Sequence, residues 1–169
     1  MDKSSSWSGD TLFSSEKQDW RTPQYVFDFF DSRYHFQLDA AAREDNALCE
    51  RFIGPEEDAL SVSWKAQTVW LNPPYGRGVG KWMEKAYREA QAGRTVGVLV
   101  FARTDTRWWH DYVMKAKQVY LIRGRLKFLG DNGEPKNAAT APSCFVVFGK
   151  YPPPDGPRFF SLDFADVRS

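Results

Sequence analysis

The sequence predicts an α/β fold with an open, mostly parallel sheet and an antiparallel C-terminal strand. Buried strands and amphipathic helices alternate from residue 68 to residue 123, and this order is typical of parallel strands joined by helices. The turn Asp131-Asn132-Gly133 then precedes a last strand at residues 143–150, which we expect to run antiparallel to its neighbour. With 169 residues, the chain is long enough for about one such domain.

The first predicted element is a helix that begins at Pro23, with Thr22 as its N-cap, and continues to about residue 33. Thr is a favoured capping residue and Pro suits the first helical position. Residues 36–40 alternate as a strand does and end in small residues. Residues 45–52 are expected to form a short helix, because their apolar residues recur at helical spacing.

The alternating part of the chain follows. We expect a buried strand at 68–72, a helix closed by Gly93, a strand at 95–102, a helix over 104–116 and a strand at 118–123. The Ser-rich residues 1–18 are expected to form a mobile arm, residues 19–150 the folded domain, and residues 151–169 a Pro-rich tail whose aromatic residues can pack back.

Composition excludes several classes of protein. The net charge is +1 and there are two cysteines and two histidines, so neither strong overall attraction to nucleic acid nor a structural metal site is indicated. No apolar stretch is long enough to span a bilayer, and no secretion signal follows the first residues. We expect a cytoplasmic protein with Cys49 and Cys144 as free thiols.

The strongest chemical signal is the segment Leu71-Asn72-Pro73-Pro74-Tyr75 at the end of a buried strand. The Asn72 side-chain carbonyl and the Pro73 backbone carbonyl can accept the two hydrogens of one planar amino group. Pro73 and Pro74 fix the turn before the substrate arrives, and the Tyr75 ring can stack on a flat heterocycle. This pattern predicts methylation of an amine with S-adenosylmethionine as donor; the alternative is a Pro-Pro strand terminator before a loop.

Other strand ends support a site at the same edge of the sheet. Asp39 and the pair Arg103-Thr104 also follow predicted strands. Because the carboxyl ends of parallel strands meet at one edge, we expect these residues to lie near Asn72.

Seven blocks in order along the chain carry a family resemblance. They are Trp20-Arg21-Thr22-Pro23, Leu38-Asp39-Ala40-Ala41-Ala42, Asn46-Ala47-Leu48-Cys49, Asp58-Ala59-Leu60 with Trp64, Leu71 to Tyr75, Ala102-Arg103-Thr104-Asp105-Thr106 with Trp109 and His110, and Gly124-Arg125-Leu126-Lys127-Phe128. Over nearly all of residues 19–150, the sequence closely resembles the small phage and prophage DNA N6-adenine methyltransferases of the Dam type. The Asn-Pro-Pro-Tyr motif occurs in other amino methyltransferases, whereas the Thr-Pro, Leu-Asp-Ala-Ala-Ala and Ala-Arg-Thr-Asp-Thr blocks are more specific.

The resemblance implies a reduced Rossmann-like methyltransferase fold, S-adenosylmethionine as donor, and transfer to N6 of a flipped-out adenine in double-stranded DNA, often within GATC. It assigns the residues from Asn72 to Tyr75 to catalysis, with Asn72 also at the donor site. It places Thr22-Pro23 near the methionine part of the donor and Asp39 in the first cofactor motif.

The donor motif departs from that of larger methyltransferases. Ala40, Ala41 and Ala42 stand where a glycine-rich turn is usual, and alanines still let a ligand approach the backbone closely. Among the acidic residues that could bind the donor ribose, Asp58 is favoured over Glu44 and Asp45 because of its place in the Asp-Ala-Leu block.

Candidate DNA contacts are basic residues that come after Tyr75 in the sequence. The segment from Arg103 to Lys136 is net basic. Within it Arg123, Arg125 and Lys127 interleave with apolar residues beside a turn, as expected of a DNA-contacting ribbon. Arg77, in the glycine-rich loop after Tyr75, is a candidate for the backbone of the flipped nucleotide.

Two alternatives remain open at this point. One is an amino methyltransferase acting on RNA or on protein glutamine, against which the Thr-Pro and Ala-Arg-Thr-Asp-Thr blocks argue. The other is a degenerate DNA-binding protein without donor binding, for which the missing glycine turn is the support.

Overall fold

The computed structural model describes residues 20–167, which form a seven-stranded sheet with helices on both faces. The elements are α2 (Gln24–Tyr34), β1 (Leu38–Asp39), β2 (Arg51–Phe52), η1 (Pro55–Glu57), β3 (Thr68–Leu71), α3 (Val79–Gln91), β4 (Thr95–Phe101), α4 (Arg107–Asp111), η2 (Val113–Lys115), β5 (Gln118–Ile122), β6 (Ser143–Phe148), β7 (Arg158–Leu162) and α5 (Phe164–Val167). The arm predicted for residues 1–18 lies outside the described residues.

The strand order is β2-β1-β3-β4-β6-β5-β7. Neighbouring strands pair in parallel except that β6 runs antiparallel to both β4 and β5. The predicted α/β class, with a mostly parallel sheet and an antiparallel strand after the Asp-Asn-Gly turn, is therefore confirmed. The carboxyl ends of β1, β3, β4 and β5 share one edge of the sheet, which we call the rim.

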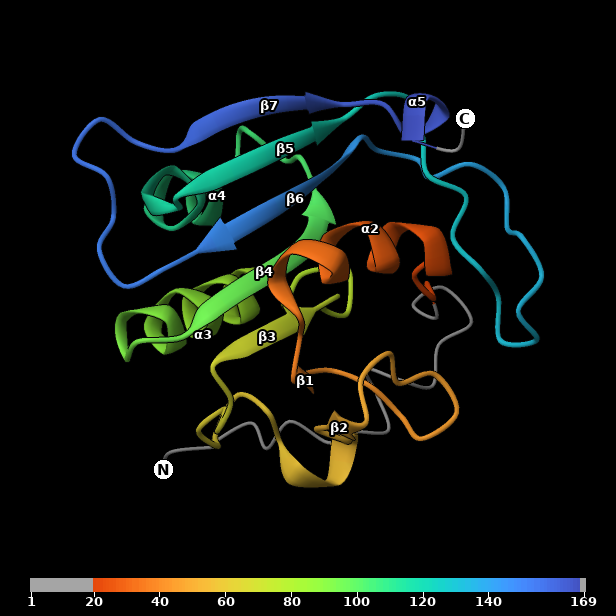
Figure 1. The fold of residues 1–169 in the computed structure, drawn as a ribbon, viewed down its shortest axis with the longest axis horizontal. Coiled ribbons are helices and arrows are strands. Elements are labelled where there is room, and N and C mark those ends of the chain that lie inside the picture. Colours follow the sequence, from red (N-terminus) through yellow and green to blue (C-terminus); the bar gives the residue numbers. More distant parts are fainter. Residues whose placement is uncertain (1–19, 168–169) are drawn as a thin grey trace, which may run out of the picture.

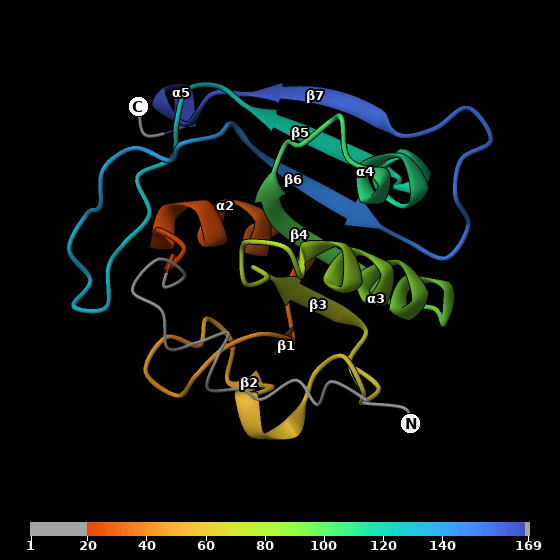
Figure 2. The same ribbon diagram turned by 180° about the vertical axis from the view of Figure 1, so that it is seen from behind.

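The two faces of the sheet bury different side chains. Figure 1 shows α2 in front of the sheet, and Figure 2 shows α3 and α4 on the opposite face. The face under α3 and α4 is mainly aliphatic, whereas the face under α2 is rich in aromatic rings. Gly97 in β4 permits this aromatic packing, because a Cβ there would lie 2.4 Å from Cζ of Phe145.

Two local predictions were wrong. Residues 45–50 form turns and bends rather than a helix. The Asn46 side chain accepts a hydrogen bond from the Arg43 amide at 2.7 Å, and the Asp39 carboxylate accepts one from the Leu48 amide at 3.1 Å. Such side-chain acceptors compete with helical hydrogen bonds for the same amides. The helix α2 has Pro23 as its N-cap residue and no side-chain cap, so Thr22 does not cap it.

The C-terminal segment packs onto the domain. Its strand β7 pairs in parallel with β5, and Phe160 of this strand stacks on Tyr120, with ring centroids 5.0 Å apart. Phe164 packs edge-on against Tyr25 at 5.3 Å and Phe29 at 5.5 Å. Residues 158–164 thus complete both the sheet and the aromatic layer under α2.

Residues 20–167 contain neither a membrane-spanning helix nor a cluster of metal ligands. No helix in this part of the chain is long and apolar enough to cross a membrane. No group of three or more His, Cys, Asp or Glu side chains there could hold a metal ion.

Candidate active site

The Asn72 side chain follows β3 at the rim, and its orientation is set by two hydrogen bonds. Its Nδ2 donates to the carbonyl oxygen of Trp20 at 2.9 Å and to the hydroxyl of Thr22 at 3.1 Å. Both acceptors come from the segment just before α2, about 50 residues earlier in the chain. Because the nitrogen takes both acceptors, the side-chain oxygen Oδ1 must face the other way.

Asn72 Oδ1 is buried and has no hydrogen-bond partner among the described residues. A buried acceptor without a donor is unfavourable by about 1–3 kcal/mol, so most buried polar atoms have a partner. An amino group placed against Oδ1 would satisfy it. The structure therefore presents the acceptor that the sequence predicts, already oriented by Trp20 and Thr22.

Thr22 is itself buried. The resemblance placed Thr22-Pro23 near the methyl donor, and the structure brings the Thr22 hydroxyl to Asn72 at the end of β3. The predicted donor element and the catalytic motif are thus in direct contact. Trp20, whose carbonyl also holds the Asn72 amide, was not among the predicted site residues, although it opens the Trp-Arg-Thr-Pro block.

Tyr75 lies in a cluster of aromatic rings and is 8% exposed. Its ring centroid is 4.4 Å from that of Phe101, 6.0 Å from Phe128 and 6.1 Å from Trp20. Burial raises the pKa of its hydroxyl above the ordinary value, and this neutral hydroxyl donates to the carbonyl of Leu99 at 3.4 Å. In this conformation, a base can stack on Tyr75 only if a neighbouring ring moves.

Asp39 ends β1 and supports the following loop from within. Its carboxylate is buried and accepts hydrogen bonds from the amides of Leu48 at 3.1 Å and Ala41 at 3.4 Å. Burial raises the pKa of Asp39 from 3.8 to about 6, although both backbone hydrogen bonds act in the opposite direction. Asp39 therefore shapes the segment containing Ala40 and Ala41, where the resemblance places the donor.

This pKa predicts how Asp39 affects stability. The pKa in the folded state, about 6, exceeds the ordinary value of 3.8. Folding thus takes up a proton, and the contribution of Asp39 to the free energy of unfolding decreases as the pH rises through 4 to 6. We expect the difference in unfolding free energy between the intact protein and Asp39→Asn to fall by about 1.4 kcal/mol from pH 5 to pH 7.5. Urea unfolding of both proteins at the two pH values measures this change; a constant difference would contradict it.

Asp58 presents a second buried acceptor. The residue follows η1, has a left-handed backbone with φ of 49°, and accepts a hydrogen bond from the Ser61 hydroxyl through Oδ2. Its other oxygen, Oδ1, is buried without a partner among residues 20–167. A sugar hydroxyl is a suitable donor for such an oxygen. Of the acids considered from the sequence, Asp45 is instead engaged by Arg21 and Arg43.

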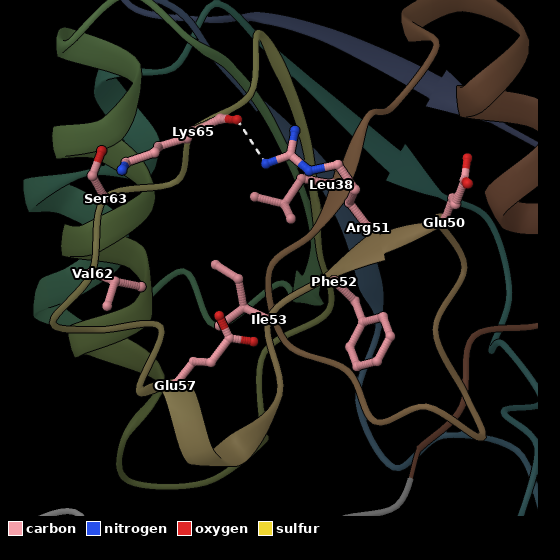
Figure 3. A pocket seen from close by; sticks show the side chains of 9 residues that line it. All are labelled: Leu38, Glu50, Arg51, Phe52, Ile53, Glu57, Val62, Ser63 and Lys65. Atoms are coloured by element: carbon pink, nitrogen blue, oxygen red, sulfur yellow. Dashed lines mark hydrogen bonds between the residues drawn. The ribbon is translucent and has the colours of Figure 1, made fainter.

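A cavity of about 510 Å³ lies beside this region, between the β1-β2 edge of the sheet and the segment before β3. Figure 3 shows Arg51 reaching across it to the Lys65 backbone carbonyl, to which it donates at 2.9 Å. Glu57 contributes to its wall, but none of the predicted site residues lines it. The cavity therefore adjoins the proposed donor site without containing it.

Comparison with known proteins decides the family. The family model for DNA N-6-adenine-methyltransferase (Dam) matches residues 9–160. The chain belongs to the DNA N-6-adenine-methyltransferase (Dam) family. It is similar to the "DNA N-6-adenine-methyltransferase" of Haemophilus phage HP1 (strain HP1c1), with 30% identity over 138 residues that cover 79% of this chain and 80% of that protein. It is also similar to the protein of the same name from Escherichia phage T1, with 34% identity over 109 residues that cover 63% of this chain and 45% of that protein.

In this Dam-family chain, three of the predicted DNA contacts, Arg123, Arg125 and Lys127, lie on an irregular hairpin between β5 and β6. Figure 1 shows this segment extending beyond the sheet, past the end of α2. Arg125 and Lys127 are exposed, whereas the alternate residues Leu126 and Phe128 are buried in the aromatic core. The hairpin therefore turns a basic side outward, while its apolar side packs into the aromatic core under α2.

The remaining basic candidates are also exposed at the rim. Arg123 pairs with Asp163 at 3.4 Å, but its side chain is 78% exposed, so this pair holds it weakly. The guanidinium of Arg103 lies over the Phe101 ring at 5.7 Å. Arg77 follows the catalytic motif in the loop before α3. Arg77, Arg103 and Arg123 thus follow β3, β4 and β5, whose carboxyl ends share the rim, with β6 between β4 and β5.

One charged network at this edge of the sheet was not predicted. Arg21 pairs with Asp45, and lies 3.9 Å from Asp131; Arg43 pairs with the same two acids at 3.2 and 3.5 Å. Desolvation alone would raise the pKa of Asp45, but hydrogen bonds and charge from Arg43 and Arg21 outweigh it and hold the pKa below its usual value. The network joins the segment before α2, the loop after β1 and the hairpin tip.

Proposed function

We propose that this DNA adenine methyltransferase uses S-adenosylmethionine and acts on N6 of an adenine turned out of double-stranded DNA. The observation that carries the proposal is the buried Asn72 Oδ1, which has no donor while Trp20 and Thr22 fix the amide. Family membership supports DNA as the substrate. The phage origin of both relatives supports action inside a bacterial cell.

The chain's own groups explain how a weak nucleophile is made reactive. The lone pair of the adenine amino nitrogen is delocalised into the ring. Hydrogen bonds from this amine to Asn72 Oδ1 and to the Pro73 carbonyl favour a pyramidal nitrogen with a localised lone pair. The same acceptors stabilise the positive charge that develops on nitrogen during attack. No base is needed before attack, because the proton can leave afterwards.

The donor residues fit the chemistry expected of them. We propose that Asp58 Oδ1 accepts from the ribose hydroxyls, that the backbone after Asp39 borders the donor at Ala40 and Ala41, and that Thr22-Pro23 lies beside its methionine part. The buried Asp58 oxygen without a partner supports the first assignment. When bound, S-adenosylmethionine supplies a methyl group on a positively charged sulfur for the amine to attack.

Base flipping is required because N6 is paired inside the duplex. We propose that the flipped adenine stacks on Tyr75 and that Arg77 contacts the backbone of its nucleotide. We propose that the basic side of the hairpin and Arg103 hold the adjoining phosphates. We expect a short recognition site such as GATC, read by the loop after Tyr75 and by the hairpin.

Nucleoside mass spectrometry tests the proposal. Unmethylated duplexes with and without GATC are incubated with the protein and S-adenosylmethionine, with Asn72→Ala as the inactive control. We expect N6-methyladenine only with the intact protein, and only in duplexes that contain the recognition site. Donor binding without any methylated DNA base would instead favour RNA or protein glutamine as the acceptor. Absence of donor binding by calorimetry would favour a degenerate DNA-binding protein.

The hairpin contacts give a second expected result. Neutralising a residue that contacts phosphate removes about one released counterion, so Arg123→Gln and Arg125→Gln should each make the slope of log Kd against log salt concentration shallower by about 0.9. Lys117→Gln is the matched control, because Lys117 is exposed and precedes β5, whereas Arg123 follows it at the opposite end. Titrations at several salt concentrations measure the slopes. Equal slopes for all four proteins would place the phosphate contacts elsewhere.

A further inference from the structure

The catalytic acceptor is covered in this structure. Asn72 Oδ1 is buried, and Tyr75 is only 8% exposed. An adenine that bonds to Oδ1 and stacks on Tyr75 must therefore take space that other groups now fill. One of the groups packed against Tyr75 must therefore move.

Trp20 lies against both Tyr75 and Asn72. Its indole contacts Tyr75 at 6.1 Å, Phe101 at 5.8 Å and Phe128 at 5.2 Å between ring centroids. Its backbone carbonyl holds the Asn72 amide at 2.9 Å. The indole thus makes the kind of aromatic contacts that a stacked adenine needs, and it belongs to a residue that bonds directly to Asn72.

The indole also has room to move. Trp20 is half-buried and lines a cavity of about 700 Å³ together with the hairpin arm from Glu134 to Thr140. A cavity of this size is within the range that holds small ligands. The cavity thus offers the indole a place toward the hairpin arm.

The backbone beside Trp20 is held by contacts that do not involve the indole. Arg21 exchanges two backbone hydrogen bonds with Leu129, at 3.1 and 2.9 Å. Its guanidinium also pairs with Asp45 and lies near Asp131. The Trp20 carbonyl can therefore keep the Asn72 amide oriented after the indole has moved.

We propose that the Trp20 indole occupies, in the free protein, the place that the target adenine takes in the complex. Base capture exchanges one flat ring for another against Tyr75, while the Trp20 carbonyl and the Thr22 hydroxyl continue to orient Asn72. Trp20 is thus a residue that controls entry of the base. This inference rests on the proposed function.

Trp20→Ala tests the exchange because it removes the indole and retains the backbone carbonyl. Binding is measured to two unmethylated duplexes that carry the recognition site. In the first duplex the target adenine is present and faces an abasic position. In the second duplex the target position itself is abasic. The Kd for the duplex with the abasic target, divided by the Kd for the duplex with the target adenine, reports preference for the base. We expect this ratio to rise at least about fivefold in Trp20→Ala, because the base no longer displaces a ring, and to rise less in Trp20→Phe. An unchanged or smaller ratio in both variants would overturn the proposal.

A second measurement uses the intact protein and does not depend on how the variants fold. The protein is labelled with 5-fluorotryptophan, and the Trp20 signal in the fluorine NMR spectrum is assigned by its loss in Trp20→Phe. We expect this signal to shift on binding the adenine duplex and not the abasic duplex; equal shifts would contradict the exchange. Methylation with an unmoved Trp20 signal would reject this inference alone, whereas a selective shift without methylation would reject only the proposed function.

Discussion

Asn72→Ala is expected to lower the rate of DNA methylation at least about 100-fold, with little change in affinity for S-adenosylmethionine. Removing a single fixed group that stabilises developing charge typically lowers kcat by about 10²–10³-fold. In this protein the amide also has no substitute, since its Oδ1 is the buried acceptor and its Nδ2 is held by Trp20 and Thr22. Single-turnover methylation and donor calorimetry measure the two quantities separately. Methylation at the intact rate would remove Asn72 from the mechanism.

Asn72→Asp is the matched control because it keeps an oxygen acceptor in nearly the same shape. Its second oxygen would replace Nδ2, which lies 2.9 Å from the Trp20 carbonyl oxygen. Two acceptors at that distance repel unless the carboxyl keeps a proton there. We therefore expect partial activity that increases as the pH is lowered, and a pH-independent ratio to the intact protein would contradict this reading of the amide geometry.

Tyr75→Ala is expected to impair both base capture and stability. Loss of stacking should weaken binding of a DNA duplex with an unpaired target adenine by about 1–3 kcal/mol. Loss of a buried aromatic ring should lower the free energy of unfolding by about 3–5 kcal/mol, because Tyr75 is 8% exposed and packs on Phe101 and Phe128. Denaturant unfolding and DNA binding below the unfolding transition measure the two effects.

Tyr75→Phe separates the ring from its hydroxyl. This variant retains the aromatic packing and loses only the 3.4 Å hydrogen bond to the Leu99 carbonyl. We expect near-normal base binding and a small loss of stability. If Tyr75→Ala weakened donor binding as much as base binding, the assignment of this ring to the adenine would be wrong.

The sequence predicted the sheet and the catalytic strand end because both depend on local patterns. Apolar strands and amphipathic helices alternate from β3 to β5, and the Asp-Asn-Gly turn specified the antiparallel strand β6. The segment from Leu71 to Tyr75 could be placed at a strand end, because Pro73 and Pro74 cannot continue a strand interior.

What the sequence did not predict depends on particular side-chain hydrogen bonds, some of them between distant segments. The spacing of apolar residues in 45–52 is helical, but the amides of Arg43 and Leu48 bond to side chains of Asn46 and Asp39 instead. The Thr22 hydroxyl has the chemistry of a helix cap, yet it bonds to Asn72, fifty residues away. The Trp20 contribution is a backbone carbonyl, which every residue type carries, so composition cannot reveal it.

The hairpin between β5 and β6 shares its interior with the rest of the protein. Leu126, Phe128, Ala139 and Ala141 belong to the same buried cluster as Tyr75 and Trp70. Grafting this hairpin from another family member would therefore replace part of the enzyme's interior along with its outer basic side. We expect target preference to be transferable through exposed positions such as Arg125, Lys127 and Asn137, while whole-segment exchange unfolds the catalytic face. Divergence of target sequence in this architecture should then proceed by single surface substitutions rather than by modular exchange.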